Sequence, residues 1–227
     1  MLAVLFLIFN EGYLATGPAT DPVRHELTAE AIRLTRLIRA LMPSDGEVAG
    51  LLALMLMTEA RGAARVSTSG ELVTLDEQDR GSWDAVLIAE GHDLVRERLA
   101  SGEAPGRYQI LAAINAVHTS ARAVNDTDWS QIVALYDQLV HLDPSPIVTL
   151  NRAVAVAELD GPDVGLAVVN RLEDRLGDYH AFHAVRADLL RRLGSTEQSR
   201  DAYDRAIELA GNTAERAYLI RRRDQLR

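Results

Sequence analysis

An internal repeat in the C-terminal half of the sequence limits the possible folds more than any other feature. From Asp128 onward, helical patterns alternate with turn residues at regular intervals. Four positions recur at an offset of 67 residues: Tyr136, Leu139, Leu142 and Pro144 correspond to Tyr203, Ala206, Leu209 and Gly211. Periods of about 20 to 50 residues are typical of proteins built from stacked units. The offset therefore predicts two periods of about 34 residues each, and with them a stack of helices.

The residues between and after the matching positions predict further helices of this stack. The expected helices span 145–158, 163–175, 179–193 and 213–226. Their boundaries are indicated by capping and turn residues: Ser145 before Pro146, Gly161, Gly194, Ser195 with Gln198, and Asn212 with Glu215. At Ser199, a small side chain lets two helices approach. This spacing resembles the tetratricopeptide pattern, although the middle unit lacks an aromatic residue in its second helix, so we predict degenerate repeats closed by a capping helix.

Apolar patterns also predict helices in the N-terminal half. Residues 1–9, MLAVLFLIF, lack the basic start of a signal peptide, since Arg24 is the first Arg or Lys, and they are too few to span a membrane. They therefore predict a buried helix. Residues 24–42 carry an apolar stripe at helical spacing. The LLALMLM run at 51–57 is apolar on nearly every side, which predicts a central buried helix that begins at a capping box of Ser44 and Glu47.

Residues 62–75 contain several Gly and Ser residues and predict a loop, followed by helices at 83–99 and 108–121. Composition agrees with helices, because 48% of the residues are hydrophobic but only 5% are aromatic, and strands favour aromatic and β-branched residues. We predict an all-α protein, a right-handed superhelix of antiparallel helix pairs, divided into a part at 1–122 and a repeat part at 123–227.

Two polar clusters are the candidate functional residues. The first, Asn10, Glu11 and Tyr13, directly follows the apolar start, and an ordinary helix end would explain it equally well. The second lies in LDEQDRGSWD at 75–84 and comprises Asp76, Gln78, Asp79, Arg80 and Trp83. A solvated loop in which Asp79 or Ser82 caps the next helix would explain part of it. We expect the two clusters to share a pocket or groove in which a carboxylate such as Glu11 or Asp76 pairs with Arg80.

No set of residues predicts catalysis or a cofactor. Three carboxylates close in sequence show no convergence from several elements, which acid/base chemistry and hard-metal sites require. His180 and His183 have helical spacing but no evident third metal ligand. The chain lacks cysteine, a phosphate-binding glycine loop and a GxSxG motif. We therefore expect no catalytic, cofactor-binding or metal-binding residues, and the net charge of −9 opposes direct binding to nucleic acid.

Almost the whole chain resembles one family. The segments LIFNEGYLATG, GLLALMLMTEARGAAR, GELVTLDEQDRGSWDAVLIAEG, YQILAAINAVH and PSPIVTLNRAVAVAE are similar to the long C-terminal extension of a group of bacterial extracytoplasmic-function sigma factors. The resemblance implies a tetratricopeptide-like extension that regulates two sigma domains, one binding RNA polymerase and one reading promoter DNA. The chain lacks both sigma domains upstream of Met1, which would make it a fragment or an isolated open reading frame.

The resemblance implies a cytoplasmic regulatory domain that binds proteins and is not an enzyme. Its implied partners are the sigma domains, RNA polymerase indirectly, and a small DGPF-motif (YCII-like) protein whose gene commonly lies beside those of the family; a membrane is not among them. The NEGY and DEQDR segments resemble the family's two most recognisable polar motifs, which suit recognition better than chemistry. A small-molecule or metal sensor that uses Glu11, Asp76, Asp79 and Arg80 is the alternative, and an enzyme ranks third.

Overall fold

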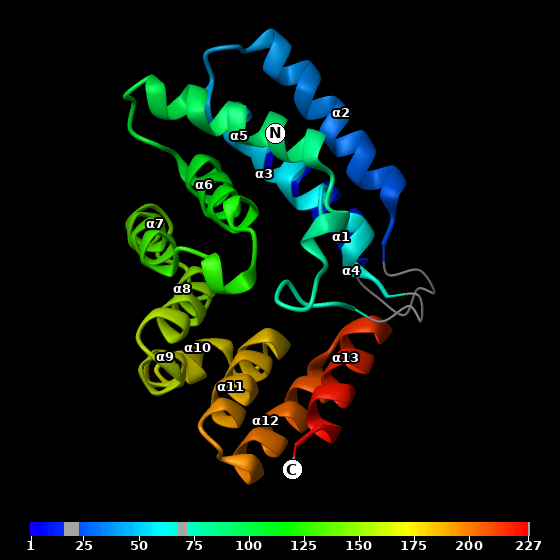
Figure 1. Cartoon of the computed structure of the whole chain (residues 1–227), viewed down its shortest axis with the longest axis vertical. Helices are drawn as coiled ribbons and strands as arrows, with labels where there is room; N and C mark the ends of the chain where they lie inside the picture. Colours follow the sequence, from blue (N-terminus) through cyan, green and yellow to red (C-terminus); the bar gives the residue numbers. More distant parts are fainter. Residues whose placement is uncertain (16–22, 68–71, 227) are drawn as a thin grey trace. The chain divides into compact units, whose positions relative to one another are not determined.

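The computed structural model describes residues 1–15, 23–67 and 72–226, and these residues form helices joined by loops (Figure 1). In the described part, the extended structure is an isolated antiparallel bridge between Val66 and Leu72. The predicted all-α class is confirmed. Contacts divide the chain into unit 1, Met1–Asp128, and unit 2, Trp129–Arg227. The sequence placed this boundary between residues 122 and 123.

Unit 1 is built around helix α3, Gly46–Glu59 (Figure 1). All residues from Leu51 to Met57 are buried, because neighbouring helices cover α3 on several sides. These neighbours are α1 (Leu2–Tyr13), α2 (His25–Leu41), α5 (Ala85–Ala100) and α6 (Arg107–Ser120). The prediction of a central buried helix is confirmed.

Helices α3 and α6 run parallel and touch closely. A Cβ atom added at Gly50 would lie 2.5 Å from the backbone nitrogen of Gln109, near the N-terminal end of both helices. Towards their C-terminal ends, Sδ of Met57 lies 3.6 Å from Oγ1 of Thr119. The C-terminal ends of the two helices are therefore neighbours.

The N-terminal ends of α3 and α6 are capped by two carboxylates. Oδ1 of Asp45 accepts hydrogen bonds from the backbone N–H groups of Glu47 and Val48 at 2.9 and 3.1 Å. The carboxylate of Glu47 accepts from the N–H groups of Tyr108 and Gln109 of α6 at 3.1 and 3.2 Å. The predicted Ser44–Glu47 capping box is therefore wrong, because Asp45 is the N-cap residue and Glu47 serves another helix.

Helix α1 is buried on one side only, which corrects the prediction of a buried first helix. Leu5 and Phe9 face the core of unit 1, whereas Val4 and Leu7 are 58% and 66% exposed. In α2 the predicted apolar stripe also ends early, because Leu41 is 81% exposed. Unit 1 thus leaves apolar side chains of its first two helices uncovered.

The segment between α3 and α5 contains a short helix, α4 (Gly62–Arg65), where a loop was predicted, and the single turn η1 (Arg80–Ser82). The part of the predicted loop at 68–71 lies outside the described residues. Helix α5 begins at Ala85 rather than Trp83, because Asp84 is its N-cap and accepts from the N–H groups of Val86 and Leu87. The expectation that Asp79 or Ser82 caps this helix is therefore wrong.

Unit 2 is a series of helices in which neighbours along the chain pack together (Figure 1). The helices are α7 (Trp129–Leu142), α8 (Pro146–Leu159), α9 (Pro162–Asn170), α10 (Glu173–Leu176), α11 (His180–Arg192), α12 (Thr196–Leu209) and α13 (Thr213–Asp224). Helix α11 also packs against α9, as expected for stacked helix pairs. The helix predicted over 163–175 is interrupted after Asn170 and continues as α10.

Two of the three predicted caps of unit 2 are confirmed. Ser145 accepts a hydrogen bond from the N–H of Val148, and Asn212 accepts one from the N–H of Glu215. The predicted capping box at Ser195 is wrong, since its side chain makes no capping hydrogen bond.

The contact between α11 and α12 consists largely of small residues around the ring of Tyr203. Tyr203 is almost completely buried, and so are Ala187, Ser199 and Ala206. Oγ of Ser199 donates to the carbonyl of Ala187 at 2.8 Å, which satisfies a buried hydroxyl at the point of close approach. The predicted role of Ser199 is confirmed.

Candidate functional site

The first predicted cluster lies at the C-terminal end of α1. Asn10 is exposed and Glu11 is partly buried. The ring of Tyr13 is stacked on Phe9 with 6.0 Å between the ring centres, and the guanidinium carbon of Arg65 lies 3.1 Å from the centre of the Tyr13 ring. This cation–π contact attaches α1 to α4.

The second cluster forms the turn before η1. Asp76 is exposed, whereas Gln78 is partly buried and donates from Nε2 to the carbonyl of Val73 at 3.1 Å. Oδ1 of Asp79 accepts from the N–H of Gly81 at 2.9 Å, and its backbone carbonyl accepts from Oγ of Ser82 at 2.7 Å. Asp79 therefore shapes the turn that presents Arg80.

Arg80 connects this turn to the C-terminal end of α6. Its Nη1 donates to the backbone carbonyls of His118 at 2.6 Å and Ala121 at 2.9 Å. The guanidinium carbon lies 4.8 Å from the centre of the buried Trp83 ring. The prediction that Glu11 or Asp76 holds Arg80 is wrong, because the last carbonyls of a helix lack partners within the helix and are good acceptors for a cation.

A second arginine, Arg61, lies at the same end of unit 1, because it follows the C-terminal end of α3. The carbonyl of Ala60 accepts from the N–H of Asp84 at 2.9 Å, which places Arg61 beside the segment that carries Arg80 and Trp83. Burial lowers the pKa of Arg61 to about 10. Burial and the charge of Arg61 lower the pKa of Arg80, while Asp126 acts in the opposite direction.

His118 completes this group, which we call the arginine cluster: Arg61, Arg80, Trp83 and His118. Burial and the positive charges of Arg61 and Arg80 lower the pKa of His118 to about 4. The imidazole is therefore neutral at pH 7, and the two guanidinium groups carry the charge of the cluster. The partial negative charges at the C-terminal ends of α3 and α6 stabilise these cations.

The arginine cluster should make the stability of unit 1 depend on pH. The folded-state pKa of His118 lies below the ordinary value of about 6.5, so the unfolded chain binds more protons between these values. The contribution of His118 to the free energy of unfolding should therefore be constant above pH 7 and fall as the pH drops from 6.5 towards 4, by about 3 kcal/mol in all. Urea denaturation followed by Trp83 fluorescence, in a Trp129→Phe background, measures this change.

A matched pair of histidine variants tests the assignment to His118. His118→Asn should reduce the decrease between pH 6.5 and 4 and leave the part due to His92, whose pKa is also lowered by burial, whereas His141→Asn, which changes an exposed histidine of unit 2, should leave the decrease unchanged. A His118→Asn protein with the original pH dependence would contradict the assignment.

The two predicted clusters are connected through α4. Arg65 of α4 lies over Tyr13, and α4 itself contacts η1, which contains Arg80. The predicted pocket shared by the clusters remains a prediction. Arg61, Arg65 and His118 were missed by sequence reasoning. The one available signal was a cation placed just after the apolar LLALMLM run, in TEARGAAR.

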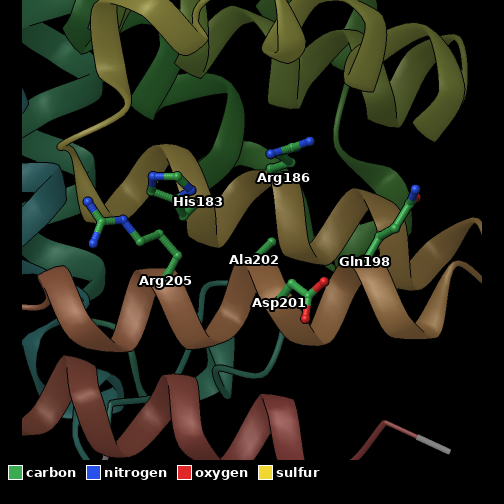
Figure 2. A pocket seen from close by; sticks show the side chains of 6 residues that line it. All are labelled: His183, Arg186, Gln198, Asp201, Ala202 and Arg205. Carbon is green, nitrogen blue, oxygen red and sulfur yellow. The ribbon is translucent and has the colours of Figure 1, made fainter.

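A separate pocket of about 250 Å³ lies between α11 and α12 of unit 2 (Figure 2). Its lining residues are His183, Arg186, Gln198, Asp201, Ala202 and Arg205. Nε2 of His183 is within hydrogen-bond distance of the carbonyl of Gly177, at 2.8 Å, and Arg205 pairs with Glu208 at 3.0 Å. Figure 2 shows Asp201 between Gln198 and Arg205 along α12, so the pocket presents both charges and amide groups.

Within the ranges that the structure describes, no group of three or more His, Cys, Asp or Glu side chains could hold a metal ion. A search of the same ranges finds no helix with the length and apolar character needed to cross a membrane.

Comparison with known proteins gives a family match for part of the chain and a relative for nearly all of it. Residues 1–99 match the model of a family of unknown function (DUF6596). The chain is similar to "Uncharacterized protein R00370" of Rhizobium meliloti (strain 1021), with 44% identity over 224 residues, which cover 98% of the chain and 52% of that protein. The chain thus spans about half the length of this curated relative.

Among solved structures, the chain is similar to a thermophilic tetratricopeptide protein, TTC0263 of Thermus thermophilus. The TM-score is 0.60 with 14% sequence identity, and the match covers 99% of the chain and 96% of the solved protein. At this identity the likeness concerns the fold alone. It shows that the chain has a tetratricopeptide-like, all-α fold.

Proposed function

We propose that the chain is a regulatory, protein-interaction domain of an extracytoplasmic-function sigma factor, which controls transcription initiation through contacts with the sigma domains or a partner protein. The tetratricopeptide-like stack of helices carries this proposal, because stacked helix pairs offer extended surfaces for binding other proteins. In the proposed role the chain catalyses no reaction, and it acts in the cytoplasm, where RNA polymerase acts.

Uncovered apolar residues in unit 1 support a role in protein binding. Met1, the N-cap residue of α1, and Val4 and Leu7 within α1 are exposed, and their spacing places them on one face of the helix. Exposed apolar patches often mark protein–protein contacts. The length of the Rhizobium relative, about twice the matched region, leaves room there for the additional domains that the proposal requires.

The charge of the chain favours proteins over DNA as direct partners. A net charge of −9 opposes the neutralisation of phosphates on which affinity for DNA depends. In the proposed assembly, the sigma domains contact the promoter and this chain contacts protein. A DGPF-motif (YCII-like) protein is the second proposed partner.

A binding experiment with separate baits tests the proposal. The purified chain is offered one of three immobilised baits: the unmatched part of the Rhizobium relative, where the proposal places the sigma domains, core RNA polymerase, or the DGPF-motif protein. We expect capture by the sigma domains or the DGPF-motif protein, and no direct capture by duplex DNA at physiological salt. Failure of every protein bait would overturn the proposal.

A pair of carboxylate variants tests whether the turn before η1 belongs to the surface that binds the partner protein. Asp79→Ala should weaken capture about tenfold or more if the turn before η1 contacts the partner, a loss of about 1.4 kcal/mol. Glu30→Ala is the matched control, because Glu30 is also an exposed carboxylate of unit 1 and pairs with Arg33 on the same helix. Equal capture of the two variants would remove the turn from the proposed interface.

The alternative, a sensor that uses Glu11, Asp76, Asp79 and Arg80, has less support as a metal site. Asp76 and Asp79 are exposed, Asp79 is engaged in shaping its own turn, and Arg80 would repel a cation. A sensor for an anion is a different case, since it would use the arginine cluster.

A further inference from the structure

Three buried hydrogen-bond donors lie in the arginine cluster without an acceptor in the described part of the chain. Among the described residues, Nε of Arg61, Nε of Arg80 and the indole Nε1 of Trp83 are buried and have no hydrogen-bond partner. The guanidinium of Arg61 makes no ion pair with any residue that the structure describes. Unpartnered buried donors are rare in folded proteins, and three in one neighbourhood call for a physical explanation.

The partial charges of the two helix ends compensate only part of the cost of burying a guanidinium, as the lowered pKa of Arg61 shows. Removing a cation from water carries a large desolvation penalty unless an anion or several acceptors replace the water. Nη1 of Arg80 donates to two backbone carbonyls at the C-terminal end of α6, but these hydrogen bonds leave Nε of the same side chain without an acceptor. The neutral His118 adds no negative charge, and Asp126, the acidic residue that acts on Arg80, is exposed.

The types of donor present indicate the chemistry of a ligand that would fit them. A guanidinium presents a planar set of N–H donors that matches the oxygen atoms of a carboxylate or a phosphate. An indole N–H is a donor only, so Trp83 also needs an acceptor. Arg61 and Arg80 both keep some surface accessible to solvent, which gives a ligand a route to the cluster.

We propose that the arginine cluster of unit 1 binds an oxyanion, a carboxylate or phosphate group, which pairs with Arg61 and accepts hydrogen bonds from the unpartnered donors. The ligand is small or presents a single such group, because the cluster is mostly buried and the chain as a whole carries a net charge of −9. The site is independent of the proposed sigma-factor role, since all its residues belong to unit 1 and no partner protein is needed to form it.

The two tryptophans of the chain allow a direct test. The indole N–H signals of the ¹⁵N-labelled full chain are followed by NMR during titration with sodium phosphate, and separately with sodium acetate, at ionic strength held constant with sodium chloride. We expect a saturable shift of the Trp83 signal in at least one titration, and a constant signal from Trp129 of unit 2. The two titrations show whether phosphate or carboxylate is preferred.

Arginine variants distinguish binding at the arginine cluster from a general effect of salt on the Trp83 signal. Arg61→Gln should weaken binding about tenfold or more, as expected for loss of a hydrogen bond to a charged group. Arg33→Gln is the matched control, because Arg33 is an exposed arginine of the same unit. Arg61→Gln should remain folded by circular dichroism, since it removes a buried charge, and Arg61→Lys provides a second variant that keeps the charge but loses the planar donors.

Two results would overturn the proposal. One is a Trp83 signal that moves with neither anion, or moves in proportion to concentration without saturation. The other is a saturable shift that persists unchanged in folded Arg61→Gln and Arg61→Lys proteins. Neither result depends on capture by sigma domains, so the site and the proposed function can fail separately.

Discussion

Replacing Gly50 with valine is expected to destabilise unit 1 by about 3 kcal/mol, which is a large part of the stability of an ordinary domain. The added side chain would meet the backbone of α6 at Tyr108 and Gln109, with the nearest atom 2.5 Å from Cβ. Backbone atoms of a packed helix cannot move aside as the end of a flexible side chain can. Urea denaturation followed by Trp83 fluorescence, in a Trp129→Phe background, measures the loss.

A second glycine provides the control for Gly50→Val. At Gly62 of α4 the nearest atom to an added Cβ is 3.9 Å away, so Gly62→Ala should be neutral or slightly stabilising. Gly50→Ala should be intermediate, because the gain in helix propensity offsets part of the clash. If Gly50→Val were as stable as the original chain, the close parallel packing of α3 and α6 would be wrong.

Removing residues 196–227 is expected to make the remaining chain self-associate. The deletion takes away α12 and α13, which cover apolar residues of α11 such as Ala187 and Leu190. Stacked repeats require a terminal unit with a polar outer face to remain soluble. Analytical ultracentrifugation should show oligomers, and binding of a hydrophobic dye should increase.

A shorter deletion controls for the loss of chain length. Removing only 225–227 takes a single side chain, Leu226, from the apolar cluster of α11 and α12 and leaves α13 in place, so the protein should remain monomeric. If the deletion of 196–227 also remained monomeric and melted at the original temperature, the assignment of α12 and α13 as the end of the stack would be contradicted.

The sequence was sufficient to predict those structural features that depend on neighbouring residues along the chain. The LLALMLM run at 51–57 has no polar face to expose, so its burial could be predicted without knowing what surrounds it. Ser145 and Asn212 cap the helices that immediately follow them, and their chemistry is local. The break between α9 and α10 was missed because no proline or glycine marks it.

The candidate site could be predicted only in part, because its partners are distant in sequence. The DEQDR segment indicated Arg80 and Trp83, but their neighbours depend on the packing of α6, whose His118 carbonyl lies 38 positions away from Arg80. Glu47 is a second example of a partner that local sequence could not predict. Its carboxylate accepts hydrogen bonds from N–H groups 61 and 62 positions away and not from its own helix. Spacing within one segment gives no information on such contacts.

The parallel arrangement of α3 and α6 has a consequence for the order in which the chain folds. Parallel neighbours cannot be joined by a short loop, so the contact of Gly50 with Gln109 closes a long stretch of chain that includes α5. Contacts between distant positions form slowly because long loops must close first. Unit 2 instead joins helices that follow one another, and its structure can grow from any pair of them. During synthesis, the half of the chain that is made first is therefore the slower half to reach its final packing.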